Sequence, residues 1–180
     1  MAYQLTGDPP SPFVLQWAGN RALRLPPPRR ALDIAMGRGR HTRALASLGF
    51  TTFGVDINLG ALLMAVREVR SLGLTVRVWC ADLTISTIPS KRFELIVVTR
   101  YLQRDLIGAI RDAVVPDGLV IYETFTVNQR THGRGPRSPD HLLQAGELEA
   151  LFQGFEILFY DEVLEPDAVA RLVARRPANR

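Results

Sequence analysis

The stretch LDIAMGRGR, residues 32–40, decides the fold of this chain. Its first half is an apolar, strand-like run, and two glycines, Gly37 and Gly39, follow one residue apart. A helical pattern then begins in RHTRALASLGF, residues 40–50. A strand, a glycine loop and a helix in this order form a cofactor-binding junction. A phosphate-bearing dinucleotide and a sulfonium-bearing amino-acid nucleoside both use such a junction, and the two ligands imply different chemistry.

Two residues of the junction separate these ligands. A dinucleotide fingerprint needs a third glycine at position 42, where this chain has Thr42. Asp33 lies inside the strand, where a carboxylate is costly unless it has partners. It can accept bonds from loop amides or, through water, from an ammonium group. Its negative charge suits a cationic ligand and would repel a pyrophosphate, so the junction favours the nucleoside.

Two further acids follow at the ends of the next predicted strands. Asp56 ends the run GVDI, where a carboxylate in a doubly wound sheet bonds the ribose hydroxyls of a nucleoside. Asp82, in CADL, can meet an adenine amino group. Because ligands bind outside the carboxyl ends of the strands in such sheets, we expect Asp33, Asp56 and Asp82 to share one site.

Strand-like and helical patterns alternate from residue 31 onward. We expect strands at 31–37, 51–57, 75–83, 93–99 and 119–125, with helices at 41–50, 60–73 and 103–115. A long polar segment follows at 126–146, then a helix near Glu147 and two strands, 155–163 and 169–176, that pair as an antiparallel hairpin. This order predicts a Rossmann-like, doubly wound α/β sheet of seven strands, mostly parallel with one antiparallel strand.

Length and composition fit a single domain, since 180 residues with 47% hydrophobic side chains can bury a sizeable core. We divide the chain into an N-terminal cap (1–30), a cofactor-binding core (31–125), a substrate-side loop (126–146) and a C-terminal helix and hairpin (147–180). In the proline-rich cap, FVLQWAGNRAL, residues 13–23, predicts a short amphipathic helix.

Several classes of protein are excluded by what the sequence lacks. The single cysteine, Cys80, permits neither an internal disulfide nor a multi-cysteine metal site, and the three histidines lack ligand spacing, so we expect no metal. No apolar run is long enough to span a bilayer, and the first residues do not resemble a secretory signal. We therefore expect a cytoplasmic protein, with no membrane partner, that is a monomer or a homodimer.

The net charge of +4 invites a nucleic-acid hypothesis, which the distribution of charge weakens. Of the 22 basic residues only Lys91 is a lysine, and the arginines are scattered rather than gathered in a stripe with aromatic residues. The chain also lacks an N-P-P-Y-like tetrapeptide after the fourth strand, where TRYL stands, and Cys80 is placed on a strand. These features disfavour chemistry on adenine amines and on cytosine C5.

The glycine loop and its acids resemble those of the class I S-adenosylmethionine-dependent methyltransferases. The first motif of that family, acid-x-Gly-x-Gly-x-Gly, is matched by Asp33, Gly37 and Gly39, with Ala35 in place of the first glycine. We expect Ala35 to be tolerated if the backbone there stays extended. The segments PSPFVLQWA, GRGRHTRALASLGF, TRYLQRDL, LVIYETFT and GPRSPDHLLQAGEL are similar to the bacterial small-molecule methyltransferases grouped with tellurite-resistance and thiopurine-type enzymes.

This resemblance implies that S-adenosylmethionine is the cofactor and S-adenosylhomocysteine the product. It also implies a set of cofactor-binding residues: Asp33, Ala35, Gly37, Gly39, Arg40, Asp56, Ile57, Asp82, Leu83 and Arg100. Methyl transfer from a sulfonium is an in-line displacement, in which positioning supplies most of the rate. A soft or anionic acceptor needs no protein base, whereas a neutral amine or hydroxyl does.

The acceptor side has two candidate catalytic residues, Tyr101 and Glu123. The resemblance implies that Arg100 and Tyr101 lie beside the sulfonium, with Tyr101 in the pocket wall. An ordinary strand-to-helix connection without a role in binding explains these two residues equally well. Glu123 ends the fifth strand and could act as a base or orient a substrate, although a structural pairing with Arg100 or Arg130 fits its position as well.

The loop 126–146 has the candidate substrate-binding residues Arg130, His132 and Arg137, which could gather around an anion. A solvated, mobile loop is the alternative, although a stretch of this length without regular structure often covers a substrate. The favoured hypothesis is methyl transfer to a small molecule, such as a thiol, a metalloid oxyanion or another anionic compound. Methylation of RNA or another nucleic acid, and a non-catalytic S-adenosylmethionine-binding module, stay open as alternatives.

Overall fold

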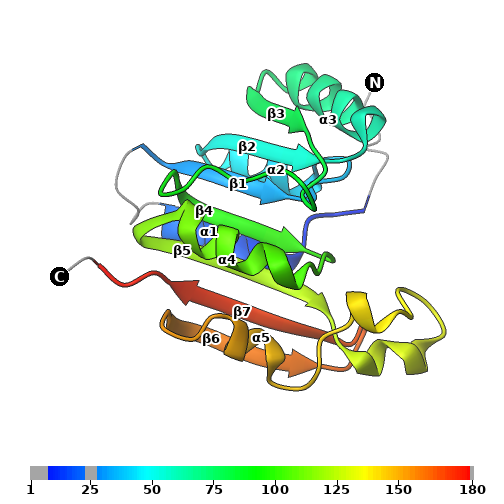
Figure 1. Cartoon of the computed structure of the whole chain (residues 1–180). Helices are drawn as coiled ribbons and strands as arrows, with labels where there is room; N and C mark the ends of the chain where they lie inside the picture. The colour runs from blue at the N-terminus through cyan, green and yellow to red at the C-terminus, as the bar shows by residue number, and fades with distance from the viewer. Residues whose placement is uncertain (1–7, 23–27, 179–180) are drawn as a thin grey trace.

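A seven-stranded sheet forms the centre of the molecule (Figure 1). The computed structural model describes residues 8–22 and 28–178, without the side chains of residues 21 and 22. The strands are β1 Arg30–Ile34, β2 Thr51–Asp56, β3 Val76–Cys80, β4 Phe93–Thr99, β5 Val114–Phe125, β6 Glu156–Val163 and β7 Val169–Arg175. They lie in the order β3-β2-β1-β4-β5-β7-β6.

The direction of the strands confirms the predicted fold class. Strands β1 to β5 pair in parallel, and β7 pairs antiparallel with both β5 and β6. Only β7 is therefore reversed within the sheet that the structure describes. Strand β4 is buried along its whole length, as is typical of a central parallel strand.

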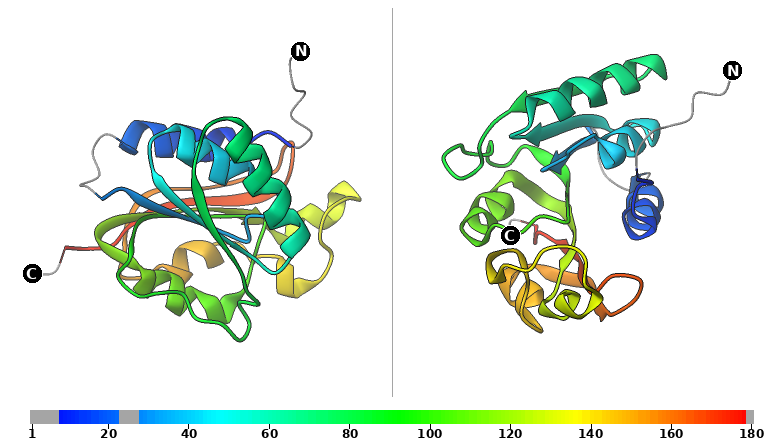
Figure 2. Two further views of the ribbon diagram at one scale, coloured as in Figure 1. Left: turned by 90° about the horizontal axis from the view of Figure 1, so that it is seen from above. Right: turned by 90° about the vertical axis from the view of Figure 1, so that its right-hand side faces the viewer.

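Helices cover both faces of the sheet (Figure 2). One face is covered by α1 Pro12–Ala22, α2 Arg40–Ser47 and α3 Leu59–Ser71; the other is covered by α4 Ile107–Ala113 and α5 Glu147–Leu151. Residues that alternate along β4 divide between the two cores, with Leu95 packed beneath α1 and α2 and Ile96 packed beneath α4 and α5. Helix α1 confirms the predicted helix of the N-terminal cap; Leu23, at its predicted end, lies outside the described residues.

Two predictions of local structure were wrong. The predicted helix 103–115 is a 3₁₀ turn, η1 Arg104–Leu106, followed by the short α4, and β5 already begins at Val114. The segment 126–146 is not irregular: it contains two 3₁₀ helices, η2 Val127–His132 and η3 Pro139–His141. Its residues Gln129, Leu142 and Leu143 are completely buried, so this segment packs against the rest of the domain.

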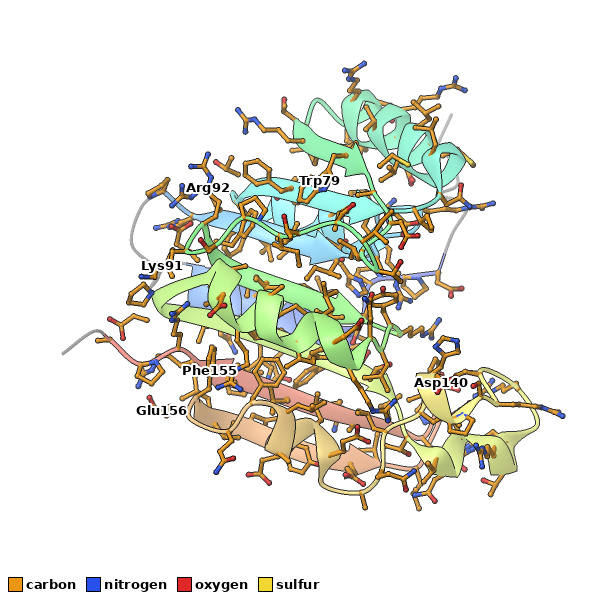
Figure 3. All side chains as sticks on the ribbon, in the orientation of Figure 1. Trp79, Lys91, Arg92, Asp140, Phe155 and Glu156 are labelled. Carbon is orange, nitrogen blue, oxygen red and sulfur yellow. The ribbon has the colours of Figure 1, made fainter. Side chains whose placement is uncertain are left out.

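The carboxyl ends of the parallel strands meet at one edge of the sheet, where η2 and η3 also lie (Figure 1). Figure 3 shows Asp140 of η3 at this end and Lys91, Phe155 and Glu156 at the opposite end. We call the edge at which the parallel strands end, near Asp140, the carboxyl edge. Among the described residues, no helix has both the length and the apolar character needed to cross a membrane.

Candidate active site

The loop between β1 and α2 turns sharply as it leaves the sheet. Ala35, Gly37 and Gly39 all adopt the left-handed conformation, with φ of 52°, 53° and 74°. The turn is held by bonds from Met36 N to Val55 O (3.0 Å) and from Gly39 N to Met36 O (2.8 Å). The expectation of extended backbone at Ala35 was therefore wrong, since the turn begins directly after β1 ends at Ile34. Ala35 adopts a conformation that costs an L-residue about 1–2 kcal/mol.

Asp33 lies beneath this loop and is 1% exposed. Thr42 Oγ1 donates a hydrogen bond of 2.6 Å to its Oδ2 atom. Thr42 therefore supplies the partner that a buried carboxylate requires, at the position where a dinucleotide fingerprint has glycine. Burial raises the pKa of Asp33 to about 7, against the opposing effects of the Thr42 bonds and the Arg40 charge. Asp33 supports the loop from below and lines none of the cavities described next.

A first cavity, of about 320 Å³, lies where β2 and β3 end. Its wall contains Asp56, Asp82 and Tyr101, together with Ala35, Ile57 and Leu83. Asp56 Oδ2 accepts a hydrogen bond of 2.7 Å from Gly37 N, and its Oδ1 accepts one of 2.8 Å from Asn58 N. These bonds fix the Asp56 carboxylate against the glycine loop.

Asp82 is held in a similar way at the end of β3. Its Oδ1 atom accepts bonds from Thr84 Oγ1 (2.6 Å) and Thr84 N (2.9 Å), which lower the pKa of the carboxyl. Of the three acids that the sequence predicts to share a site, Asp56 and Asp82 line the same cavity, whereas Asp33 lies buried beneath the glycine loop.

A second cavity, of about 480 Å³, lies on the other side of the glycine loop. Its walls include Gly37, Arg40, Thr99 and Arg100, and it shares Ala35 with the first cavity. The two cavities together form a cleft that runs past the glycine loop from the end of β3 to the end of β4. Gly39 does not line this cleft. A Cβ at Gly39 would stand 2.9 Å from Ala65 Cβ and 3.0 Å from Met36 Cε, so this glycine permits close packing beside α3.

A third cavity, of about 430 Å³, adjoins the second and shares Asp8, Arg40 and Arg100 with it. We call it the acceptor pocket. Glu123 of β5 and Arg171 of β7 face it, and the segment Asp8–Phe13 and the β6–β7 turn complete its wall. Glu123 is partly buried, and its Oε2 atom accepts a bond of 3.1 Å from Ser11 Oγ. Neither Arg100 nor Arg130 forms an ion pair with it in the part of the chain that the structure describes.

Sequence reasoning missed His41 and Ser11, which join the N-terminal cap to the carboxyl edge. His41 is 2% exposed; its Nε2 accepts a bond of 2.9 Å from Ser11 N, and its Nδ1 lies 3.2 Å from Thr99 Oγ1. Because Nε2 accepts from a backbone N–H, the ring proton is on Nδ1 and is donated to Thr99. Burial, together with Arg40 and Arg100, lowers the pKa of His41 to about 3. The sequence offers one signal for His41: it stands in the first turn of the helix that follows the two glycines.

Tyr101 stands between the first cavity and a smaller one that is lined by Phe125, Pro136 and His141. Its hydroxyl donates to Gln103 Oε1, and its carbonyl accepts a bond of 2.9 Å from Tyr122 Oη. Burial raises the pKa of Tyr101, which favours the neutral phenol. The structure therefore places Tyr101 in a pocket wall.

The three predicted substrate-binding residues of the loop lie apart from these cavities. Arg130 donates to Arg137 O (3.1 Å), and His132 Nε2 lies 3.6 Å from Glu165 Oε1. None of Arg130, His132 and Arg137 is among the residues that line the cavities described above. From the same loop, Pro136 and His141 do reach the cavity wall beside Tyr101. Substrate binding by Arg130, His132 and Arg137 stays a prediction.

The chain is similar in sequence to a known family and in structure to known folds. A family model described as a methyltransferase domain matches residues 31–118. No curated protein matches the sequence. Three solved structures illustrate the likeness in fold.

TehB from Haemophilus influenzae is 18% identical with a TM-score of 0.70, over 88% of this chain and 61% of TehB. An S-adenosylmethionine-dependent methyltransferase from Mesorhizobium loti is 20% identical with a TM-score of 0.67, over 90% of this chain and 100% of that protein. The [4+2]-cyclase SpnF is 16% identical with a TM-score of 0.75, over 92% of this chain and 80% of SpnF.

The match to the family model begins with β1 and includes the glycine loop, Asp56 and Asp82. The three solved structures share the overall fold of this chain. The chain spans less than two thirds of TehB, so the likeness to TehB concerns the shared domain. Residues 31–118 therefore match a methyltransferase-domain model, and the chain shares the Rossmann-like α/β fold of these solved structures.

Proposed function

We propose that this protein transfers a methyl group from S-adenosylmethionine to a small-molecule acceptor. One observation carries the proposal: a cleft that passes the glycine loop, with Asp56 and Asp82 in its wall, adjoins a separate pocket lined by Glu123. A site for a nucleoside and a site for a second reactant thus lie side by side at the carboxyl edge, where ligands bind in doubly wound sheets.

The residues of the cleft fit S-adenosylmethionine in their chemistry. Asp56 is fixed at the end of β2, where a carboxylate accepts bonds from ribose hydroxyls, and Asp82 with Leu83 faces the same cavity as an adenine-binding pair. Arg40 offers a guanidinium to the carboxylate of the methionine part. Asp33 is buried beneath the loop, so we expect it to act by holding the loop through Thr42 rather than by direct contact with the cofactor.

The cofactor, when bound, supplies an electrophilic methyl group on a sulfonium. The protein's own contribution is to hold the acceptor in line with that group and to exclude water, which can account for about 7–11 kcal/mol of the barrier. The glycine loop and the walls at Thr99, Arg100 and Tyr101 orient the cofactor side, and the segment Asp8–Phe13 closes the acceptor side.

The size of the acceptor pocket supports a small molecule. A volume of about 430 Å³ lies in the range typical of small-ligand sites. We also propose that the protein works in the cytoplasm as a monomer or a homodimer, because its one thiol, Cys80, is free and exposed, as is usual in a reducing compartment.

Replacing Asp56 tests the cofactor site. We expect Asp56→Ala to weaken S-adenosylhomocysteine binding by about 10- to 100-fold, because the ribose loses its charged acceptor and Gly37 N loses its partner. Asp56→Asn keeps the side-chain shape and should weaken binding less. Isothermal titration calorimetry measures both affinities.

The matched control is Asp112→Ala, which removes an exposed carboxylate near the opposite end of the sheet and should leave the affinity unchanged. Equal affinities of the Asp56→Ala variant and the wild type would show that the ribose assignment is wrong. A folded wild-type protein that does not bind S-adenosylhomocysteine would overturn the proposed function itself.

A further inference from the structure

The acceptor pocket has a largely apolar wall. Beside its charged residues lie seven apolar side chains from the N-terminal segment, β6, the β6–β7 turn and β7: Pro9, Pro10, Pro12, Phe13, Val163, Pro166 and Val169. Phe13 packs against Phe159 with ring centroids 5.4 Å apart, and the Arg171 guanidinium lies 5.3 Å from the centre of the Phe13 ring. This wall fits a compact apolar compound better than a highly charged one.

The arginines at the acceptor pocket already have carboxylate partners. Arg100 lies 3.1 Å from Asp8 and 3.7 Å from Asp167, and Arg40 lies 3.9 Å from Asp8. Arg171 forms a two-point pair with Asp161, with distances of 2.8 and 2.5 Å. An anionic acceptor would have to compete with these carboxylates, while a cationic acceptor would face three arginines. The surrounding charges therefore favour a neutral acceptor.

Glu123 differs from the other carboxylates of the acceptor pocket. Asp8 and Asp167 are paired with arginines, and Glu165 lies beside His132. Within the described ranges, Glu123 forms no ion pair, and its only side-chain hydrogen bond is the one that Ser11 Oγ donates to Oε2. Its Oε1 atom is thus available to a ligand in the pocket.

Two features prepare Glu123 for this contact. The His41 ring holds Ser11 N, so the Ser11 hydroxyl is kept beside the carboxylate. Burial raises the pKa of Glu123 above its ordinary value, while Ser11 and the charges of Arg171, Arg40 and Arg100 oppose the rise. A carboxylate with a raised pKa accepts a proton more readily than an exposed one.

We propose that the acceptor is a compact, largely apolar compound with a neutral hydroxyl group, and that Glu123 is the general base for its methylation. This inference rests on the proposed methyltransferase function. As the hydroxyl oxygen forms its bond to the methyl carbon, the carbon–sulfur bond breaks and its electron pair stays on sulfur. The hydroxyl proton passes to Glu123 Oε1 and later to water, so the products are a methyl ether, a neutral thioether and the regenerated carboxylate.

Labelled transfer tests the acceptor class. The wild-type protein is incubated with S-[methyl-³H]adenosylmethionine and three separate sets of compounds: neutral phenols and alcohols, thiols, and carboxylates with metalloid oxyanions. We expect ether-linked label in the first set. The same preparation is titrated with S-adenosylhomocysteine by calorimetry.

The binding measurement separates the two proposals. If the cofactor product binds but label enters only the thiols or the anions, or enters no set, the hydroxyl acceptor is wrong while the cofactor site stands. If the folded protein does not bind S-adenosylhomocysteine, both proposals fail.

The variant Glu123→Gln tests whether Glu123 is the general base. Its substrate is the hydroxyl compound that the wild-type protein labels best. General-base catalysis contributes roughly 10²- to 10⁴-fold, so we expect kcat to fall by at least about 100-fold with little change in affinity for S-adenosylhomocysteine. The wild-type rate should decline on the acid side as Glu123 becomes protonated, and this limb should be absent in the variant.

Glu156→Gln is the matched control, since Glu156 is exposed at the far end of β6 and pairs with Arg175 (Figure 3). Its kcat and pH profile should equal those of the wild type. A Glu123→Gln variant that keeps kcat within about threefold, or keeps the acid limb, would overturn the role of Glu123 as the base.

Discussion

Asp33 and His41 are two buried titratable residues whose effects on stability oppose each other. The pKa of Asp33 is raised from 3.8 to about 7, so the native state keeps a proton that the unfolded chain has released. The free energy of unfolding therefore falls as the pH rises from about 4 to about 7. The pKa of His41 is lowered from 6.5 to about 3, so here the unfolded chain binds the proton that the native state excludes. This contribution falls as the pH drops from about 6.5 to about 3.

Single substitutions separate these two contributions. Asp33→Asn removes the destabilisation that an ionised Asp33 causes near neutral pH, so the His41 contribution remains. We therefore expect the free energy of unfolding of this variant to rise from pH 4.5 to 7.5. At pH 7.5 it should exceed that of the wild type by up to about 4 kcal/mol. His41→Gln can still accept from Ser11 N, and its stability should fall over the same range. Urea unfolding followed by circular dichroism measures both slopes.

Glu156→Gln, at an exposed position, should keep the wild-type dependence of stability on pH. If Asp33→Asn also keeps it, the pKa of Asp33 is not raised by burial. That result would mean that the carboxylate beneath the loop is ionised in the native state at all pH values tested.

The junction of β1, the glycine loop and α2 is the element that the sequence predicts best and in which one detail was wrong. Strand β1, its loop and α2 lie where the pattern places them because β1 is buried on both faces and its apolar run leaves little choice. The wrong detail is Ala35, whose backbone adopts the left-handed conformation next to the bond from Met36 N to Val55 O of β2. That contact joins residues far apart in the chain, and local patterns do not contain it.

Met36 is a second case in which local sequence patterns do not contain a long-range contact. Its Sδ atom occupies the space beside Gly54 of β2, where an added Cβ would stand 2.1 Å away. The sequence offers a methionine and a glycine, and only the fold shows that one requires the other. In the same way, the predicted helix 103–115 begins with a 3₁₀ turn whose Arg104 bonds to Glu147 (2.5 Å) and to Leu142 O (3.0 Å), and local patterns do not contain these long-range contacts.

Ala35→Gly tests the strain at this junction. Glycine adopts the left-handed conformation without a Cβ penalty of about 1–2 kcal/mol, and its greater freedom in the unfolded chain offsets about 0.4–1 kcal/mol of this gain. We expect the free energy of unfolding to rise by roughly 0.5–1 kcal/mol. Chemical denaturation at a pH near 7 measures it, and binding of S-adenosylhomocysteine should not weaken.

The matched control is Ala44→Gly within α2, where the same substitution should destabilise the protein by about 1 kcal/mol. A destabilised Ala35→Gly variant, similar to this control, would show that the turn at Ala35 carries no strain that glycine can relieve.

At the scale of the whole molecule, the sequence predicts the sheet and the meeting of Asp56 and Asp82 in one cavity, but only part of the pocket that we propose for the acceptor. Asp56 and Asp82 could be assigned because strand ends converge in this fold. Ser11, His41 and Arg171 come from the N-terminal cap, α2 and β7, and they meet only when the cap lies across the carboxyl edge. Arg130 and Arg137, which were expected around an anion, line none of the described cavities. The arginines that do line the acceptor pocket, Arg40, Arg100 and Arg171, are paired with carboxylates, which a count of charges does not reveal.

This pairing also bears on the competing nucleic-acid hypothesis. Many arginines are held by carboxylates, among them Arg30 with Glu94 (2.8 Å) and Arg171 with Asp161 (2.5 Å). A paired guanidinium displaces few counterions from a phosphate backbone, so the net charge of +4 overstates the attraction to RNA.

We expect a fluorescein-labelled single-stranded RNA to bind more weakly than about 10 μM at 150 mM salt. Between 50 and 200 mM salt, the logarithm of the binding constant should change with the logarithm of salt concentration by a slope of magnitude below about 2, corresponding to at most about three phosphate contacts. Fluorescence anisotropy measures both quantities. A slope of magnitude near 5 or above, together with tritium from the labelled cofactor incorporated into the RNA, would establish RNA as the acceptor in place of a small molecule. It would also mean that the paired arginines exchange their carboxylate partners for phosphates on binding.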